Sequence, residues 1–392
     1  IGVLPPFGFN NTYAIGVPKA LAIELNLKNV SDLVRYPDLK IGWGEEFRLR
    51  QDGWPGLRKR YGLPHKFVRG MDHDIAYRAL QNGDIQVTDL YSTDAEIAYY
   101  NLAILNDNLN FFPSYEALFL YRLEQAEKSR KFLPALARLS GKISDSQMIE
   151  MNRQVKLVKR PTREVVAEFL EKTFGWKVKY RVVTRAERLW QRTKEHLLLV
   201  FFSLLFAIMA GVPLGIFAEK LPTVGRGILW TVGIIQTIPA LALLVVLIRP
   251  LNLIGLSGIG DTPAFIALFL YSLLPIVRST HTGFQQISFV LRETASVLGL
   301  SRWRRLCRIE IPLALPSIIS GIKTAAVMNV GFATLGALVG AGGYGQPILT
   351  GIRLDNYSLI LEGALPAAVF ALIAQQFFDF IEGKIVSPGL RA

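Results

Sequence analysis

Long apolar runs dominate the second half of the chain, whereas the first half alternates short apolar and polar stretches. A helix needs roughly 20 consecutive apolar residues to cross a hydrocarbon core of about 30 Å. Five runs approach this length: His196–Ala218, Gly227–Ile248, Pro263–Gly283, Pro312–Val339 and Leu359–Ile381. The fourth carries Lys323 and Asn329, so we expect it to tilt, break or face a bundle interior. The pattern predicts an all-α membrane domain of five transmembrane helices.

Residues 1–180 show a different pattern, in which β-rich and helical stretches alternate. The β-rich stretches are Lys40–Trp43, Ile85–Leu90, Leu102–Leu105 and Ala117–Tyr121. The helical stretches are Lys19–Leu25, Asp74–Asn82, Asp94–Tyr100, Ala126–Leu139 and Arg163–Phe174. Ser144 followed by Gln147 fits a capping box at the start of a further helix. The alternation predicts an α/β domain with a mostly parallel sheet.

Charge changes this picture only in the membrane half. The chain carries 44 Lys+Arg and 31 Asp+Glu, a net charge of +13, but no basic helix or aromatic-basic stripe indicates nucleic acid. The single cysteine, Cys307, excludes a disulfide within the chain, and the scattered histidines form no metal-ligand cluster. We interpret Asp72-His73-Asp74 as a solvated helix start rather than a metal site.

The positions of Lys and Arg between the apolar runs predict the orientation in the membrane. The loop after the third run and its flanks hold Arg278, Arg292, Arg302, Arg304, Arg305 and Arg308, and the first loop holds Lys220 and Arg226. The loops around residues 249–261 and 353–355 are nearly neutral. Because Lys/Arg-rich loops stay in the cytoplasm, we expect residues 286–313 and the C-terminus inside and the N-terminal domain outside.

The arginine-rich loop also contains the most specific pattern of the chain, ETASVLGLSRWRRLCRIEIPL at Glu293–Leu313. A helix is expected at about Ser288–Leu298, and Gly299 can adopt the left-handed conformation that ends it. One face of this helix is formed by Ile287, Leu291, Thr294 and Leu298. The small side chain of Ala295 would let another protein's backbone approach closely. A plain juxtamembrane helix would explain the cations but not the Glu-x-Ala-x-x-x-Gly spacing.

This segment resembles the EAA loop of bacterial ABC importer permeases, which docks into the ATPase subunit. The resemblance assigns ATPase docking to Glu293, Thr294, Ala295 and Gly299, within a loop at about 286–313. Segments such as GVPLGI, QTIPALAL, YSLLPIVR and LVGAGGYG extend this resemblance over residues 196–385. They resemble the permeases of glycine betaine, carnitine and choline uptake. It implies a MetI-like permease fold, several spans in a bacterial inner membrane, and a second copy or a related permease.

Three segments of the first half resemble the substrate-binding proteins of the same transport group. They are FNNTYAIGV at Phe9–Val17, TDLYSTDAEI at Thr88–Ile97 and FFPSYEALFL at Phe111–Leu120. The resemblance implies a periplasmic-binding-protein-like (type II) domain at 1–178. It begins partway through such a protein, so we expect a partial clamshell, incomplete at its N-terminus through processing or truncation. Residues 179–195 would form a linker with a basic interfacial helix.

The resemblance assigns an aromatic box around a quaternary ammonium group to Tyr13, Tyr91 and Tyr115. A trimethylammonium group donates no hydrogen bond, so ring faces select it, each contributing about 0.5–2 kcal/mol when desolvated. Asn11 and Thr12 are candidate polar contacts. The competing interpretation is that these tyrosines are ordinary packing residues. Ser114 and the pair Leu118-Phe119 depart from the family pattern close to the ligand, which leaves another trimethylated amine such as ergothioneine open as the solute.

Together these observations predict the permease and substrate-binding subunit of an ATP-driven ABC importer for glycine betaine, choline, carnitine or a related solute. No G-x-x-x-x-G-K-[ST] loop occurs, so no cofactor is expected in this chain, and ATP-Mg belongs to a partner ATPase. A ligand-gated channel would need a re-entrant filter loop, and a sensor would bring no ATPase. An enzyme is the least supported class, because no triad, metal cluster or carboxylate pair emerges.

Overall fold

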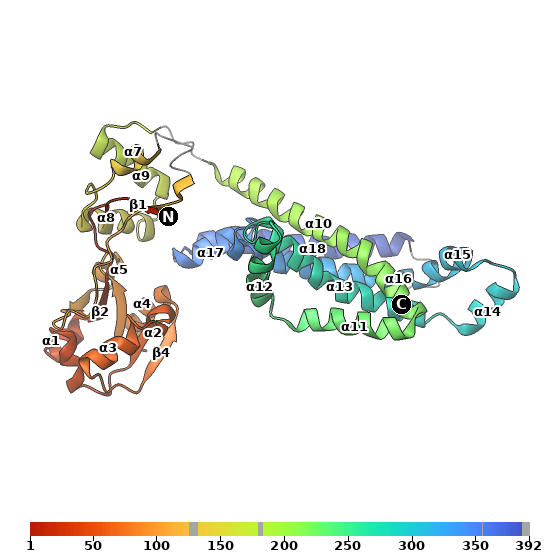
Figure 1. The fold of residues 1–392 in the computed structure, drawn as a ribbon, viewed down its shortest axis with the longest axis horizontal. Coiled ribbons are helices and arrows are strands. Elements are labelled where there is room, and N and C mark those ends of the chain that lie inside the picture. The colour runs from red at the N-terminus through yellow and green to blue at the C-terminus, as the bar shows by residue number, and fades with distance from the viewer. Residues whose placement is uncertain (125–131, 179–182, 355, 386–392) are drawn as a thin grey trace. The chain divides into compact units, whose positions relative to one another are not determined.

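The computed structural model describes residues 1–124, 132–178, 183–354 and 356–385. The chain divides into two compact units, Ile1–Arg181 and Val182–Ala392, coloured from red to green and from green to blue in Figure 1. Residues 126–131 of the helix expected at 126–139, and 179–182 of the expected linker, lie outside the described residues. Each unit is described by itself.

The first unit is built around a five-stranded sheet in the order β4-β3-β5-β2-β6. These strands are β2 (Tyr13–Pro18), β3 (Ile41–Gly44), β4 (Val68–Met71), β5 (Val87–Tyr91) and β6 (Leu102–Leu105). Strand β3 is parallel to β4 and β5, but β2 is antiparallel to β5 and β6. The expectation of a mostly parallel sheet is therefore wrong. Strand direction depends on which strands become neighbours, and the local alternation of strands and helices does not reveal this.

Short helices surround this sheet, and its core is aromatic. The helices are α1 (Lys19–Glu24), η1 (Val30–Arg35), α2 (Glu45–Leu49), α3 (Trp54–Tyr61), α4 (His73–Asn82) and α5 (Glu96–Tyr99). Trp43 and Phe47 are completely buried and pack together, with ring centroids 5.0 Å apart. Burial of large aromatic side chains is a major source of stability in the core of a small domain.

A second group of elements in this unit lies along β1 (Gly2–Val3) and β7 (Leu120–Tyr121), which pair antiparallel. It contains α7 (Phe132–Ala137), α8 (Asp145–Lys156) and α9 (Thr162–Phe174). The capping box at the start of α8 is confirmed: the Ser144 hydroxyl accepts the Gln147 amide, and the Gln147 side chain accepts the Ser144 amide. The β-rich stretch expected at 117–121 forms a strand only over its last two residues.

The second unit is a helix bundle. Its elements are α10 (Arg185–Lys220), α11 (Pro222–Thr237), α12 (Ala240–Leu253), α13 (Asp261–Gln285), α16 (Ile311–Ala333) with the 3-10 turn η3 (Thr334–Val339), α17 (Gly345–Arg353) and α18 (Tyr357–Ile385). Helices α10, α13, α16 and α18 run side by side in Figure 1. Among the described residues, four helices are long and apolar enough to span a membrane, and α11 with α12 makes a fifth if this pair, bent by 104°, is one span.

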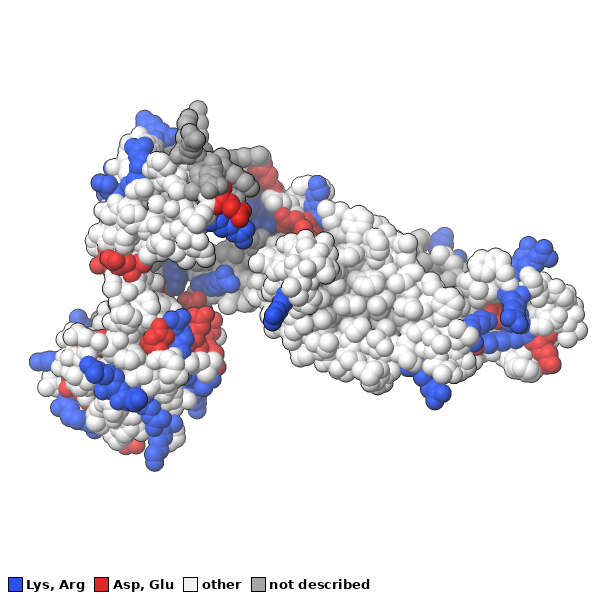
Figure 2. All heavy atoms as spheres, viewed as in Figure 1, with Lys and Arg blue, Asp and Glu red and all other residues white. Residues whose placement is uncertain are grey.

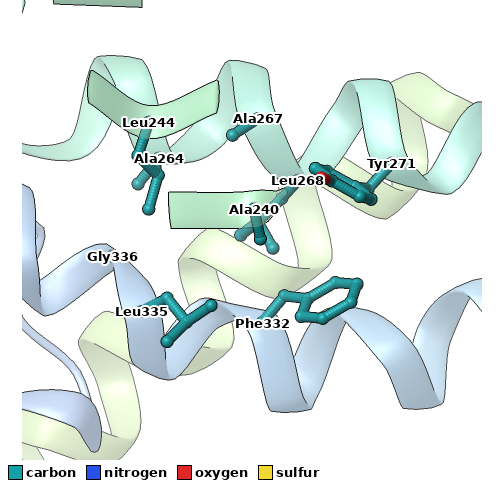
Figure 3. A pocket seen from close by; sticks show the side chains of 9 residues that line it. All are labelled: Ala240, Leu244, Ala264, Ala267, Leu268, Tyr271, Phe332, Leu335 and Gly336. Carbon is teal, nitrogen blue, oxygen red and sulfur yellow. The ribbon is translucent and has the colours of Figure 1, made fainter. Parts of the chain in front are cut away.

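The break between α11 and α12 occurs at Ile238-Pro239, inside the run expected as one helix. Proline has no amide hydrogen, so the helix ladder is interrupted there. The Tyr271 hydroxyl of α13 donates a hydrogen bond to the Ile238 carbonyl at this break. Figure 3 shows Tyr271 beside a small apolar pocket between α12, α13 and the α16–η3 run. With about 10 Å³ of free space, this pocket holds at most one water.

The polar residues of the fourth span have partners within the bundle. Asn329 is buried and its side-chain amide donates to the Ser203 hydroxyl at 3.2 Å, which confirms that this part of the span faces the interior. Lys323 pairs with Asp379 at 2.8 Å. The flank of the bundle turned to the viewer in Figure 2 is almost free of charged side chains, which lie mainly toward its two ends. This distribution suits a bilayer.

The basic segment before the first span is not a separate interfacial helix over its described residues. Helix α10 begins at Arg185 and continues without interruption to Lys220. Thr184 caps it, because its hydroxyl accepts the Glu187 amide at 3.1 Å while the Glu187 carboxylate accepts the Thr184 amide. A good cap and a run of helix-forming residues extend the spanning helix beyond its apolar part.

Candidate functional site

Three tyrosines that are distant in sequence lie together in the first unit. The antiparallel register of β2 and β5 places Tyr13 directly opposite Tyr91, and their ring centroids are 5.1 Å apart. Tyr115 comes from the segment before β7, where the Asn10 side chain accepts its amide at 2.7 Å. Its ring stands nearly perpendicular to that of Tyr13, at 5.8 Å and 86°. The structure therefore brings together the three tyrosines expected to form a box.

These rings line an open groove of about 580 Å³. The groove residues are Phe9, Asn11, Tyr13, Arg50, Tyr91, Thr93, Asp94, Tyr115, Glu116, Ala117, Met148 and Asn152. Tyr13 is only 7% exposed, and its ring centroid lies 4.9 Å from that of Phe47. The Tyr13 ring therefore belongs to the hydrophobic core and also lines the groove. The volume suffices for a small solute.

Of the two polar contacts expected beside Tyr13, only Asn11 lines the groove. Its side-chain oxygen accepts the Thr93 hydroxyl at 2.6 Å. Thr12 is not among the groove residues, because its hydroxyl donates to the Pro113 carbonyl at 3.2 Å and its amide donates to the Ser92 hydroxyl at 3.1 Å.

An arginine and a carboxylate hold one edge of the aromatic cluster. Arg50 binds Asp52 through two bonds, from Nε at 2.8 Å and from Nη2 at 2.6 Å. Asp52 also accepts the Tyr115 hydroxyl at 2.6 Å. Burial, together with this hydrogen bond to a carboxylate, raises the pKa of Tyr115 to about 12, so the ring stays a neutral phenol. The Nη1 hydrogens of Arg50 lie outside this pair and suit an anionic group in the groove.

A histidine with two carboxylates lies behind Tyr91. Asp94 accepts from His73 Nε2 at 3.0 Å, from the Tyr77 hydroxyl at 2.5 Å and from the Tyr91 amide at 2.9 Å. His73 Nδ1 lies 3.5 Å from Asp89. Burial alone would lower the pKa of His73, but hydrogen bonds and charge from Asp89 and Asp94 raise it to about 10. The ring is therefore a cation at neutral pH, 4.7 Å from the Tyr91 centroid.

This network corrects the interpretation of Asp72-His73-Asp74. Asp72 does cap a helix, since its side chain accepts the Asp74 amide at 3.0 Å. His73, however, is mostly buried rather than solvated, because Asp89 of β5 and Asp94, which follows β5, reach it. Sequence reasoning missed its role, and that of Arg50, because their partners belong to other elements. Asp94 lies in the motif TDLYSTDAEI, which was the one available signal.

Helix α8 contributes two residues to the lining of the groove. Met148 and Asn152 line it, and the Asn152 side-chain amide donates to the Thr93 carbonyl at 3.0 Å. One turn further on, Lys156 pairs with Asp74 at 3.2 Å and with Glu96 at 3.0 Å. These contacts join the β1–β7 group to the sheet group.

A second candidate site is the arginine-rich loop of the bundle. It contains α14 (Phe289–Val297), α15 (Arg302–Arg305) and the π-helix η2 (Leu306–Glu310), at one end of the bundle in Figure 1. The helix expected at 288–298 is confirmed, and the Ser288 hydroxyl caps it by accepting the Val290 amide at 3.2 Å. Gly299 has φ = +77°, and the next amide, of Leu300, donates to the Ala295 carbonyl at 3.2 Å. A left-handed residue at this place ends the helix.

The predicted docking residues divide by exposure. Glu293, Thr294 and Gly299 are exposed, together with large apolar side chains at Phe289, Val290, Leu291, Val297, Leu298 and Trp303. An exposed apolar patch of this kind indicates an interaction surface. Ala295 is only 2% exposed, so the expectation that it admits a partner's backbone is wrong. Its small side chain instead packs within the unit itself.

Comparison with known proteins assigns each unit separately. Residues 1–172 match the substrate-binding domain of ABC-type glycine betaine transport systems. Residues 211–387 match the binding-protein-dependent transport system inner membrane component. These matches confirm the resemblance of both halves.

Curated relatives match about half of the chain. It is 39% identical over 199 residues to the osmoprotectant import permease protein OsmW of Salmonella typhimurium, covering 51% of this chain and 92% of the relative. It is 35% identical over 208 residues to the glycine betaine/carnitine/choline transport system permease protein OpuCB of Bacillus subtilis, covering 53% and 93%. A crystal structure of a glycine betaine/carnitine/choline ABC transporter is 35% identical, with a TM-score of 0.38, covering 43% of this chain and 63% of that one.

Proposed function

Because this chain belongs to the permease family of bacterial osmoprotectant importers and carries a glycine betaine-type substrate-binding domain ahead of its permease domain, we propose that it both captures and conducts a quaternary-ammonium solute in an ATP-driven importer. The observation that carries this proposal is the groove in which Tyr13, Tyr91 and Tyr115 converge. Ring faces attract a cation that cannot donate hydrogen bonds. The binding domain would comprise residues 1–178 and the permease domain residues 196–385.

The exposed arginine-rich loop, formed by α14, α15 and η2 and called the docking loop from here on, supports an ATPase partner for this chain. Glu293 and Thr294 lie beside apolar side chains, a combination that suits a groove on another subunit. The ATPase would bind ATP-Mg and act on the loop, which the positive-inside rule places in the cytoplasm together with the C-terminus. The binding domain would then lie outside. Since about five spans make half of a pathway, a second copy of this chain, or a related permease, would complete it.

Arg50 favours a zwitterionic solute over a purely cationic one. It is the one Lys or Arg among the groove residues that the structure describes, and its guanidinium already forms the Asp52 pair through Nε and Nη2. A carboxylate of the solute could take the remaining hydrogens while its ammonium group contacts the rings. Glycine betaine, carnitine and histidine betaines such as ergothioneine have both groups, whereas choline has no carboxylate.

Replacing Arg50 by methionine should therefore weaken glycine betaine binding by about 10-fold or more, because a charge-assisted hydrogen bond contributes about 1.5–3 kcal/mol. Choline affinity should change by less than about 3-fold. Titration calorimetry on the purified full chain measures both. Arg48→Met is the matched control, since Arg48 pairs with Glu45 and does not line the groove. Equal losses for both ligands, or none for betaine, would remove Arg50 from the site.

A further inference from the structure

Five charged side chains from α10, α14, α15 and η2 form two groups of ion pairs at the docking-loop end of the bundle. On one side, Arg292 of α14 pairs with Glu219 of α10. On the other, Glu310 at the end of η2 pairs with Lys220 of α10 at 2.6 Å and with Arg305 of α15 at 3.0 Å. We call these five residues the charge clasp.

The two carboxylates of the charge clasp are shielded from water, which distinguishes it from ordinary surface ion pairs. Glu310 is fully buried, with a side-chain exposure of 0%, and Glu219 and Arg292 are mostly covered. A buried charge is costly unless it is paired and hydrogen-bonded. Arg292 also donates to the Phe284 carbonyl of α13. Each charged side chain therefore constrains the backbone that carries its partner. Removal of one partner leaves the other as an unpaired buried charge.

The charge clasp also reaches the docking residues through their neighbours in sequence. Arg292 immediately precedes Glu293, so the contact with Glu219 fixes the helix turn that presents Glu293. Arg305 of α15 donates to the Ser296 hydroxyl of α14 at 2.7 Å, while its Nε holds Glu310. The two short helices on either side of Gly299 are thus tied to each other and to the end of α10.

We infer that the last turn of α10 belongs to the docking module, with Glu219 and Lys220 as positioning residues that hold the loop in the shape the ATPase engages. Helix α10 is also the first helix after the substrate-binding unit, and it runs unbroken from Arg185 to Lys220. A displacement of the docking loop is therefore passed to the helix that follows the binding domain. This inference rests on the proposed function, because it assumes an ATPase partner.

A charge swap tests the inference with the full chain and its ATPase subunit in proteoliposomes. Glu219→Arg and Arg292→Glu should each lower ATP-driven glycine betaine uptake by about 10-fold or more, since each places like charges face to face. The double variant Glu219→Arg/Arg292→Glu should recover uptake to within about 3-fold of wild type. Recovery of uptake in the double variant would show that the two side chains act through their mutual attraction, because two independent losses would add rather than cancel. Arg226→Glu, an exposed reversal on α11, is the matched control and should stay within about 2-fold.

Two further measurements distinguish a positioning role of Glu219 from a folding defect, and test it independently of the proposed solute. Glu219→Gln keeps the size of the side chain, and should hydrolyse ATP while importing about 5-fold less solute per ATP. Recovery of the ATPase subunit with the purified chain is measured in the same samples and does not depend on the solute. Normal uptake per ATP in Glu219→Gln, or a double variant as impaired as the single ones, overturns the inference. If the wild type recovers the ATPase but imports no quaternary amine, the proposed solute is wrong. The charge clasp is then judged from ATPase recovery alone: lower recovery in the two single variants than in the double variant supports it, and equal recovery in all of them contradicts it.

Discussion

Replacing Gly299 by valine should lower solute uptake by about 10- to 100-fold and leave ligand binding unchanged. Gly299 has φ = +77°, a conformation that a β-branched residue adopts only at a cost of about 1–3 kcal/mol. Added atoms would not collide, since a Cβ there meets no atom within 4 Å. The expected loss therefore comes from backbone conformation alone, which sets the angle between α14 and α15. Uptake into proteoliposomes and calorimetric binding measure the two effects.

The control for this prediction is Gly299→Asn. Asparagine tolerates the left-handed region far better than valine, so this variant should keep most of its uptake. An equal loss in both variants would show that the exposed surface at this position, rather than its backbone, matters for docking. Full activity of Gly299→Val would contradict the role given to the sharp turn after α14.

Replacing Tyr91 by alanine should raise the dissociation constant for glycine betaine by about 10- to 30-fold. The ring centroid is 5.1 Å from that of Tyr13 and 4.7 Å from that of His73, and the ring lines the groove. A desolvated cation–ring contact contributes up to about 2 kcal/mol, which sets this magnitude. Tyr91→Phe keeps the ring face and should change the constant by less than about 3-fold. Titration calorimetry of the full chain gives both values.

Tyr99→Ala provides the matched control, because Tyr99 belongs to the same unit but is 63% exposed and does not line the groove. It should bind glycine betaine as wild type does. If Tyr91→Ala also binds normally, the tyrosines are packing residues and the aromatic box is wrong. If Tyr91→Phe is as weak as Tyr91→Ala, the hydroxyl rather than the ring face selects the solute.

The sequence predicted those parts of the molecule that depend on local pattern. Apolar length identified the spans, and the Ser144–Gln147 spacing identified the cap of α8. The motifs around Tyr13, Tyr91 and Tyr115 carried enough information to place all three in one groove. The bend at Ile238-Pro239 was not predicted, because a proline within an apolar run kinks, breaks or merely loosens a helix according to the neighbours that satisfy its backbone.

Features that depend on contacts between distant residues could not be predicted. Strand β2 runs against β5 and β6, although nothing in its own residues specifies direction. His73 was interpreted as solvated because Asp89 and Asp94 approach it only through the fold. Ala295 was assigned to a partner's surface, yet it is buried within its own unit. The charge clasp likewise joins α10 to residues some 70–90 positions away.

The most direct test of the central claim is radiolabelled uptake by the full chain and its ATPase subunit in proteoliposomes. Glycine betaine is supplied on the side of the binding domain and ATP on the side of the docking loop. The account predicts accumulation above the external concentration with ATP, and none with a non-hydrolysable analogue. Uptake that proceeds equally without nucleotide and stops at equilibrium would show a channel and contradict an ATP-driven importer.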